Sequence, residues 1–133
     1  MNLLNRKILV VDDAANWRTT LETVLKSSGF EVRSAATVVE AYQALSEESF
    51  AAAILDVRLD TMEDNIEGIT TVLNGAHRQD PRLGFVVISS YYSEEEVKSM
   101  VPKGVSVMYV DKNNFKIDEL VAALEQLGRS KNA

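Results

Sequence analysis

The stretch Lys7-Ile8-Leu9-Val10-Val11-Asp12-Asp13 places four apolar residues in a row directly before two aspartates. A short apolar run that ends in charge is typical of a strand buried on both faces. The run is too short for the hydrophobic part of a signal peptide, and no apolar stretch of the chain approaches transmembrane length. We therefore expect a central strand of a cytoplasmic protein, with carboxylates at its end.

Outward from this stretch, apolar runs alternate with segments of helical periodicity. Further strands are predicted over residues 31–35, 51–55, 85–88 and 105–110. Thr37 with Glu40, and Ser93 with Glu96, have the spacing of capping boxes that open helices. An amphipathic last helix is predicted from Ile117 to Leu127, and residues 128–133 are expected to form a frayed tail.

Five repeats of strand then helix predict a parallel sheet with helices on both faces, because crossovers between parallel strands are right-handed. The expected fold is α/β, a flavodoxin-like doubly wound (βα)5 unit in three layers. At 133 residues, without an internal repeat or linker, the chain is expected to be a single domain over 1–133 with its core at about 6–128.

Composition excludes several classes of function. The formal net charge of -6 argues against direct binding of nucleic acid and against binding to a membrane surface. The absence of cysteine excludes disulfides, thiolate metal sites and cysteine nucleophiles. His77 is the single histidine, so a multi-histidine metal site is impossible.

The carboxyl ends of the predicted strands, where open α/β sheets bind their ligands, carry the unusual polar residues. These residues are Asp12, Asp13, Asp56, Ser89, Ser90 and Lys112. Three close carboxylates stay ionised together only with a cation among them, and oxygen ligands suit Mg²⁺. A carboxylate nucleophile, a metal, a lysine and a hydroxyl together suit phosphoryl transfer to a carboxylate. Each residue alone is more often a cap or a loop residue, but the combination favours a site.

At these residues the sequence resembles the receiver domains of two-component response regulators, including those similar to chemotaxis regulators. The matching stretches are residues 7–13, 53–56, 85–90 and 109–112. The resemblance extends over about residues 6–128 and implies the strand order 2-1-3-4-5. It also implies a phosphoryl-accepting signalling switch rather than an enzyme, since such a domain catalyses only its own phosphoryl transfer and dephosphorylation.

The resemblance assigns a metal role to four residues. Asp56 is similar to the phosphoacceptor, which also contributes to the metal site. Asp13 is similar to the direct acidic Mg²⁺ ligand, and Asp12 to the carboxylate that supports the ion through water. The backbone carbonyl of Arg58 corresponds to the third ligand.

The remaining site residues are assigned in the same way. Lys112 is similar to the lysine that contacts the phosphoryl group, and Tyr109 to the aromatic residue that turns inward on activation. Tyr109 is equally compatible with an ordinary half-buried strand tyrosine. Ser89 is assigned as the switch hydroxyl, because Ser90 then occupies the next position, where the family has a small side chain. Ser90 is the alternative, because it fits the spacing to Lys112 better.

Two features depart from the pattern of the family. The loop over residues 57–67 is several residues longer than usual and lacks the usual proline. Asn113 follows Lys112 where the family has a proline in a cis peptide, and a cis bond before asparagine is much more costly. The isomer of the Lys112–Asn113 peptide is left open by the sequence.

The expected partners follow from the resemblance. A histidine kinase or a histidine phosphotransfer protein would supply the phosphoryl group, and a downstream protein effector would receive the signal. Because the chain ends after the fifth helix, output is expected through a partner, through phosphorelay, or from a removed domain. The chain is expected to be a monomer or a phosphorylation-dependent homodimer.

Two other interpretations compete with the phosphoryl-accepting switch. A degenerate receiver could serve as an interaction module without phosphorylation. A phosphatase with an aspartyl-phosphate intermediate is disfavoured, because Arg58 stands where such enzymes need a second aspartate.

Overall fold

The computed structural model describes residues 6–12, 14–57, 73–89, 92–101 and 103–132. Its strands are β1 (Lys7–Val11), β2 (Glu31–Ala35), β3 (Ala52–Val57), β4 (Gly84–Ser89) and β5 (Val107–Asp111). All four neighbouring pairs are parallel, in the order β2-β1-β3-β4-β5. The predicted α/β fold and strand order are therefore confirmed.

Helices follow the strands as predicted. They are α1 (Ala15–Ser27), α2 (Val38–Glu47), α4 (Glu94–Met100) and α5 (Ile117–Asn132), with residues 73–79 also helical. Ser93 forms the predicted reciprocal capping box with Glu96. At α2 the Thr37 hydroxyl accepts from the Glu40 N–H, but the Glu40 carboxylate accepts from the Ala36 N–H, so that box is only half formed.

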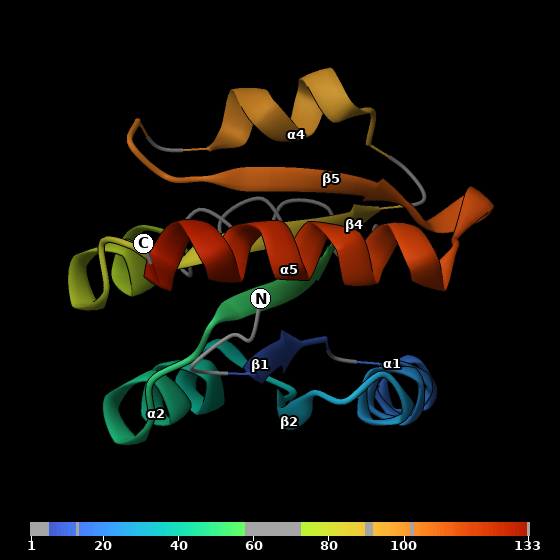
Figure 1. Ribbon diagram of the computed structural model, residues 1–133. Helices are drawn as coiled ribbons and strands as arrows, with labels where there is room; N and C mark the ends of the chain where they lie inside the picture. The colour runs from blue at the N-terminus through green and yellow to red at the C-terminus, as the bar shows by residue number, and fades with distance from the viewer. Residues whose placement is uncertain (1–5, 13, 58–72, 90–91, 102, 133) are drawn as a thin grey trace.

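The sheet has a separate hydrophobic core on each face, and Figure 1 shows α5 passing in front of the strands. On one face Leu9, Leu55 and Val87 pack under α2, residues 73–79 and α4. On the other face Ile8 and Ile54, with further alternate strand residues, pack under α1 and α5. Alternation within each buried strand produces both cores, since successive side chains point to opposite faces. The three-layer arrangement fixes the carboxyl ends of all five strands along one edge.

The end of α5 differs from the prediction of a frayed tail. The helix continues through Gly128 to Asn132. A single glycine costs a helix only about 1 kcal/mol, and the residues after it include good helix formers. Leu127, one residue before Gly128, packs so closely on β4 that a Cβ on Gly84 would lie 2.6 Å from its Cδ2.

Within the described ranges, no helix combines the length and the apolar character needed to cross a membrane.

Candidate carboxylate site at the sheet edge

The carboxyl ends of β1, β3 and β5 bring two predicted site residues into direct contact. Asp56 lies at the carboxyl end of β3, one residue before its last residue, and its side chain is 0% exposed. Lys112 follows β5 and donates from Nζ to Asp56 Oδ2 at 2.5 Å, with 22% of its own side chain exposed. A fully buried carboxylate is thus paired with a cation that still reaches solvent. The pair places a positive charge directly beside a buried carboxylate oxygen.

Asp12 lies beside this pair and is fixed on several sides. Its backbone N–H donates to the Ala35 carbonyl at 3.0 Å, and its backbone carbonyl accepts from the Arg18 guanidinium at 2.7 Å. Its Oδ1 accepts from the Ala14 N–H at 2.9 Å. The side chain therefore has little freedom to turn away from Asp56.

Two carboxylate oxygens at this site find no hydrogen-bond partner among the described residues. They are Asp12 Oδ2 and Asp56 Oδ1, and both are buried. Burial raises the pKa of Asp12 to about 7, and so do the charge of Asp56 and the hydrogen bond that a protonated Asp12 would donate to Asp56. Buried acceptors without donors are costly, and a divalent cation with oxygen preference would satisfy both. These two carboxylates fit part of a Mg²⁺ site, and no group of three or more acidic or histidine ligands gathers among the described residues.

The raised pKa of Asp12 predicts how stability depends on pH without metal. Between about pH 4 and pH 7 the folded protein holds a proton on Asp12 that the unfolded chain has released. The free energy of unfolding should therefore fall as pH rises through this window, by up to about 1.4 kcal/mol per pH unit, and level off above it. Denaturant titrations in a metal chelator would measure this slope. In the Asp12→Asn variant, the free energy of unfolding should not show this fall between about pH 4 and pH 7. Equal slopes in the two proteins would refute the prediction.

The end of β4 links two further predicted residues through the backbone of Tyr92. The Ser89 side chain is completely buried, and its Oγ accepts from the Tyr92 N–H at 2.9 Å. The Tyr109 hydroxyl donates to the Tyr92 carbonyl at 2.7 Å and lies 3.4 Å from the Ser89 carbonyl. Burial is the main cause that raises the pKa of Tyr109. One peptide segment, at Tyr92, thus connects the Ser89 and Tyr109 side chains.

Tyr92 is not among the site residues that the sequence predicts. Its contribution comes from backbone groups, which carry no residue-type signal. The only available signal was its position three residues after Ser89, where a hydroxyl can accept from a backbone N–H.

The segment after β5 adopts a short 3₁₀ turn, η1 (Lys112–Asn114). The Asp111 side chain accepts from the Asn113 N–H at 2.9 Å and caps this turn. The Lys112–Asn113 peptide is trans. Lys112 therefore reaches Asp56 without a cis bond.

Several predicted residues lie outside the described part of the chain. They are Asp13, Arg58, Ser90 and the loop positions after Val57. The expected third carboxylate, the backbone ligand and the choice between Ser89 and Ser90 therefore stay predictions.

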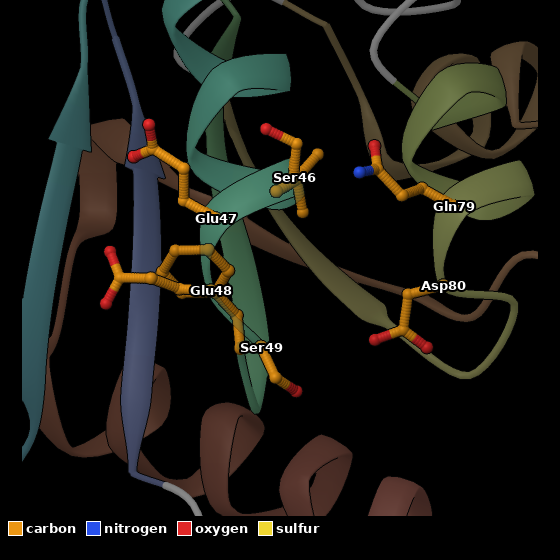
Figure 2. Close-up of a pocket in the computed structure, with 8 residues that line it drawn as sticks. Ser46, Glu47, Glu48, Ser49, Gln79 and Asp80 are labelled. Carbon is orange, nitrogen blue, oxygen red and sulfur yellow. The ribbon is translucent and has the colours of Figure 1, made fainter.

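A separate hollow of about 290 Å³ lies near the amino ends of the strands, away from Asp56. It is lined by residues 45–50 together with Gln79 and Asp80. Figure 2 shows the carboxylates of Glu47 and Glu48 turned away from Gln79 and Asp80. Both carboxylates pair with Arg33 of β2, and Glu48 also pairs with Lys7 of β1. These acidic groups are thus engaged by strand residues and do not converge on the hollow.

Comparison with known proteins agrees with this geometry. The response regulator receiver domain family matches residues 8–125. An NtrX-like response regulator of Rickettsia bellii is 29% identical over 119 residues, which cover 90% of this chain and 24% of that protein. The transcriptional regulatory protein GltR of Pseudomonas aeruginosa is 48% identical over 59 residues, covering 44% of this chain and 24% of GltR. The chain spans about a quarter of the length of these relatives.

Solved structures show the same architecture. A CheY-like receiver domain protein from Methanospirillum hungatei superposes with a TM-score of 0.79 at 24% identity, covering 96% of this chain and 97% of that one. NtrX from Brucella abortus superposes with a TM-score of 0.79 at 26% identity, covering 97% of this chain and 28% of that one. With the family match over most of its length, the chain belongs to the response regulator receiver domain family of two-component signalling.

Proposed function

We propose that this domain is a signalling switch that accepts a phosphoryl group on Asp56 from a histidine kinase or a histidine phosphotransfer protein. The observation that carries the proposal is the buried Asp56 carboxylate, paired with Lys112 and facing the unpartnered Oδ2 of Asp12. Receiver domains are generally signalling modules rather than enzymes. The downstream step belongs to a protein effector that recognises the phosphorylated form.

The proposed transfer is an in-line displacement at phosphorus. A carboxylate oxygen of Asp56 attacks the phosphorus of the donor, and a phosphorus–oxygen bond forms to Asp56. The bond between phosphorus and the donor breaks, and the leaving group takes the electron pair. Lys112, already 2.5 Å from Asp56, is placed to offset the charge of the phosphoryl oxygens without moving far.

Receiver domains typically use Mg²⁺, and the donor set here fits it. Asp56, Asp13 and the Arg58 carbonyl would hold the ion directly, and Asp12 would support it through water. A bound Mg²⁺ supplies positive charge that neutralises the carboxylates and attracts phosphate oxygens. Its presence would also remove the cost of burying the two unpartnered oxygens.

Ser89 and Tyr109 are proposed to report the phosphoryl group to the surface. A hydroxyl accepts and donates at the same time, so Ser89 can keep its bond from Tyr92 while donating toward a phosphoryl oxygen. A shift of Ser89 would move the Tyr92 segment, whose carbonyl holds the Tyr109 hydroxyl. A two-state element of this kind is biased by a local change of charge.

The direct test uses acetyl phosphate as the phosphodonor. Incubation of the protein with acetyl phosphate and Mg²⁺, followed by intact mass measurement, should show the addition of one phosphoryl group. Peptide mapping should place it on Asp56, and a metal chelator should prevent it. Failure to gain the group at any Mg²⁺ concentration would favour an interaction module that works without phosphorylation.

A further inference from the structure

We propose that Trp17 is a positioning residue that holds Lys112 toward Asp56. The proposal rests on the function proposed above, because it concerns the lysine of that site. Lys112 Nζ lies over the Trp17 ring, 4.7 Å from the ring centroid, while it donates to Asp56 Oδ2. The ammonium group is therefore held by a carboxylate and by the face of an indole. Tryptophan is the aromatic side chain that attracts cations best.

Trp17 is itself held in place by an aromatic neighbour. It occupies the first turn of α1, and its ring makes an edge contact with Phe115, with centroids 5.3 Å apart and planes at 75°. Phe115 follows η1 directly, three residues after Lys112. This pair ties the start of α1 to the segment that carries Lys112. The indole face is thus fixed relative to the lysine before any phosphodonor arrives.

The environment of the indole N–H indicates that Trp17 has a role besides packing. Trp17 Nε1 is buried and finds no acceptor among the described residues. A buried donor without a partner reduces stability, and a leucine or phenylalanine would pack there without one. The placement is therefore not explained by a hydrogen bond of the indole. The contact between its face and the Lys112 ammonium does explain it.

The consequence for the reaction is preorganisation. Lysine has a long flexible stem, so a free ammonium group would sample many positions near the surface. Holding it in line with Asp56 places the charge before the transition state forms, which is when it lowers the barrier. Loss of an interaction of this kind corresponds to a rate change of about threefold to tenfold.

The experiment compares Trp17→Leu and Trp17→Phe with wild type for phosphorylation by acetyl phosphate at saturating Mg²⁺. Trp17→Leu should react about threefold to tenfold more slowly, and Trp17→Phe should recover part of the rate because it keeps an aromatic face. The variants are then repeated in the Lys112→Met background. There, Trp17→Leu should change the rate by less than about twofold, because no ammonium remains to be positioned.

A second measurement does not depend on phosphorylation. The Hε protons of Lys112, assigned by comparison with Lys112→Met, should show a ring-current shift in wild type that is lost in Trp17→Leu. Equal rates for wild type and Trp17→Leu, or the same loss with and without Lys112, would overturn the proposal. Because wild type must first gain a phosphoryl group on Asp56, failure of the proposed function would be seen separately.

Discussion

Replacing Asp56 with asparagine is expected to abolish phosphoryl incorporation, a loss of more than about 1,000-fold relative to wild type. The asparagine amide has nearly the shape of the carboxylate but no anionic oxygen to attack phosphorus. The described fold brings no other carboxylate into contact with Lys112, whose ammonium pairs with Asp56 Oδ2. Intact mass after incubation with acetyl phosphate and Mg²⁺ measures the effect. A phosphoryl group gained at the wild-type rate would show that Asp56 is not the acceptor.

The variant also carries its own test of correct folding. Asp56 raises the pKa of Asp12 through a hydrogen bond and through its charge, in addition to the larger effect of burial. Removing the Asp56 charge should therefore lower the pKa of Asp12 and narrow the pH window in which stability changes. A suitable control is Asp118→Asn, which removes an exposed carboxylate from the first turn of α5. This control should be phosphorylated like wild type.

Much of the fold was predictable because local patterns and global architecture agree. The central strands β1, β3 and β4 are apolar runs that must be buried on both faces, and the long helices α1 and α5 have an apolar stripe that must cover the sheet. Asp12, Asp56 and Lys112 come directly at strand ends, so the parallel sheet alone brings them to one edge. Asp56 and Lys112 are 56 residues apart in the sequence, and their contact follows from this topology.

The contacts that the sequence did not reveal depend on side-chain direction or on backbone groups. Trp17 has the helical spacing of a core residue. This spacing does not reveal that one face of its ring meets the Lys112 ammonium group. Tyr92 connects Ser89 and Tyr109 through its N–H and its carbonyl, which every residue other than proline possesses. The predicted helix ends at Leu127, whereas α5 continues to Asn132, and the packing of Leu127 on Gly84 holds that part of the helix against β4.

The two carboxylates and the lysine form one electrostatic unit, and this unit determines what loss of the cation should do. Lys112 is among the groups that lower the pKa of Asp12, against the larger opposing effects of burial and of Asp56. Without Lys112, the two buried carboxylates would lose the ammonium group that pairs with Asp56 Oδ2. The protein could then relieve the repulsion only by holding a proton or by binding a cation more strongly.

Lys112→Met should therefore reduce the rate of phosphorylation by about 100-fold, because it removes a preorganised charge from the position where phosphoryl oxygens gather. Methionine keeps much of the length and apolar stem of lysine, so packing against Trp17 is largely retained. The remaining rate should keep rising to a higher pH than in wild type, because loss of Lys112 raises the pKa of Asp12 and the proton on Asp12 must leave before Mg²⁺ binds. Initial rates with acetyl phosphate from pH 6 to pH 9 at fixed Mg²⁺ would measure both effects.

The matched control is Lys116→Met, which removes an exposed lysine four residues further along the chain. Both variants lose one positive charge, so a general effect on attraction of the anionic phosphodonor should appear in both to the same extent. Lys112→Met should show the large loss and the pH profile shifted to higher pH, and Lys116→Met should show neither, since Lys112 contacts Asp56. If the two variants lost rate equally, Lys112 would act through net charge alone, and its direct role at the phosphoryl group would have to be abandoned.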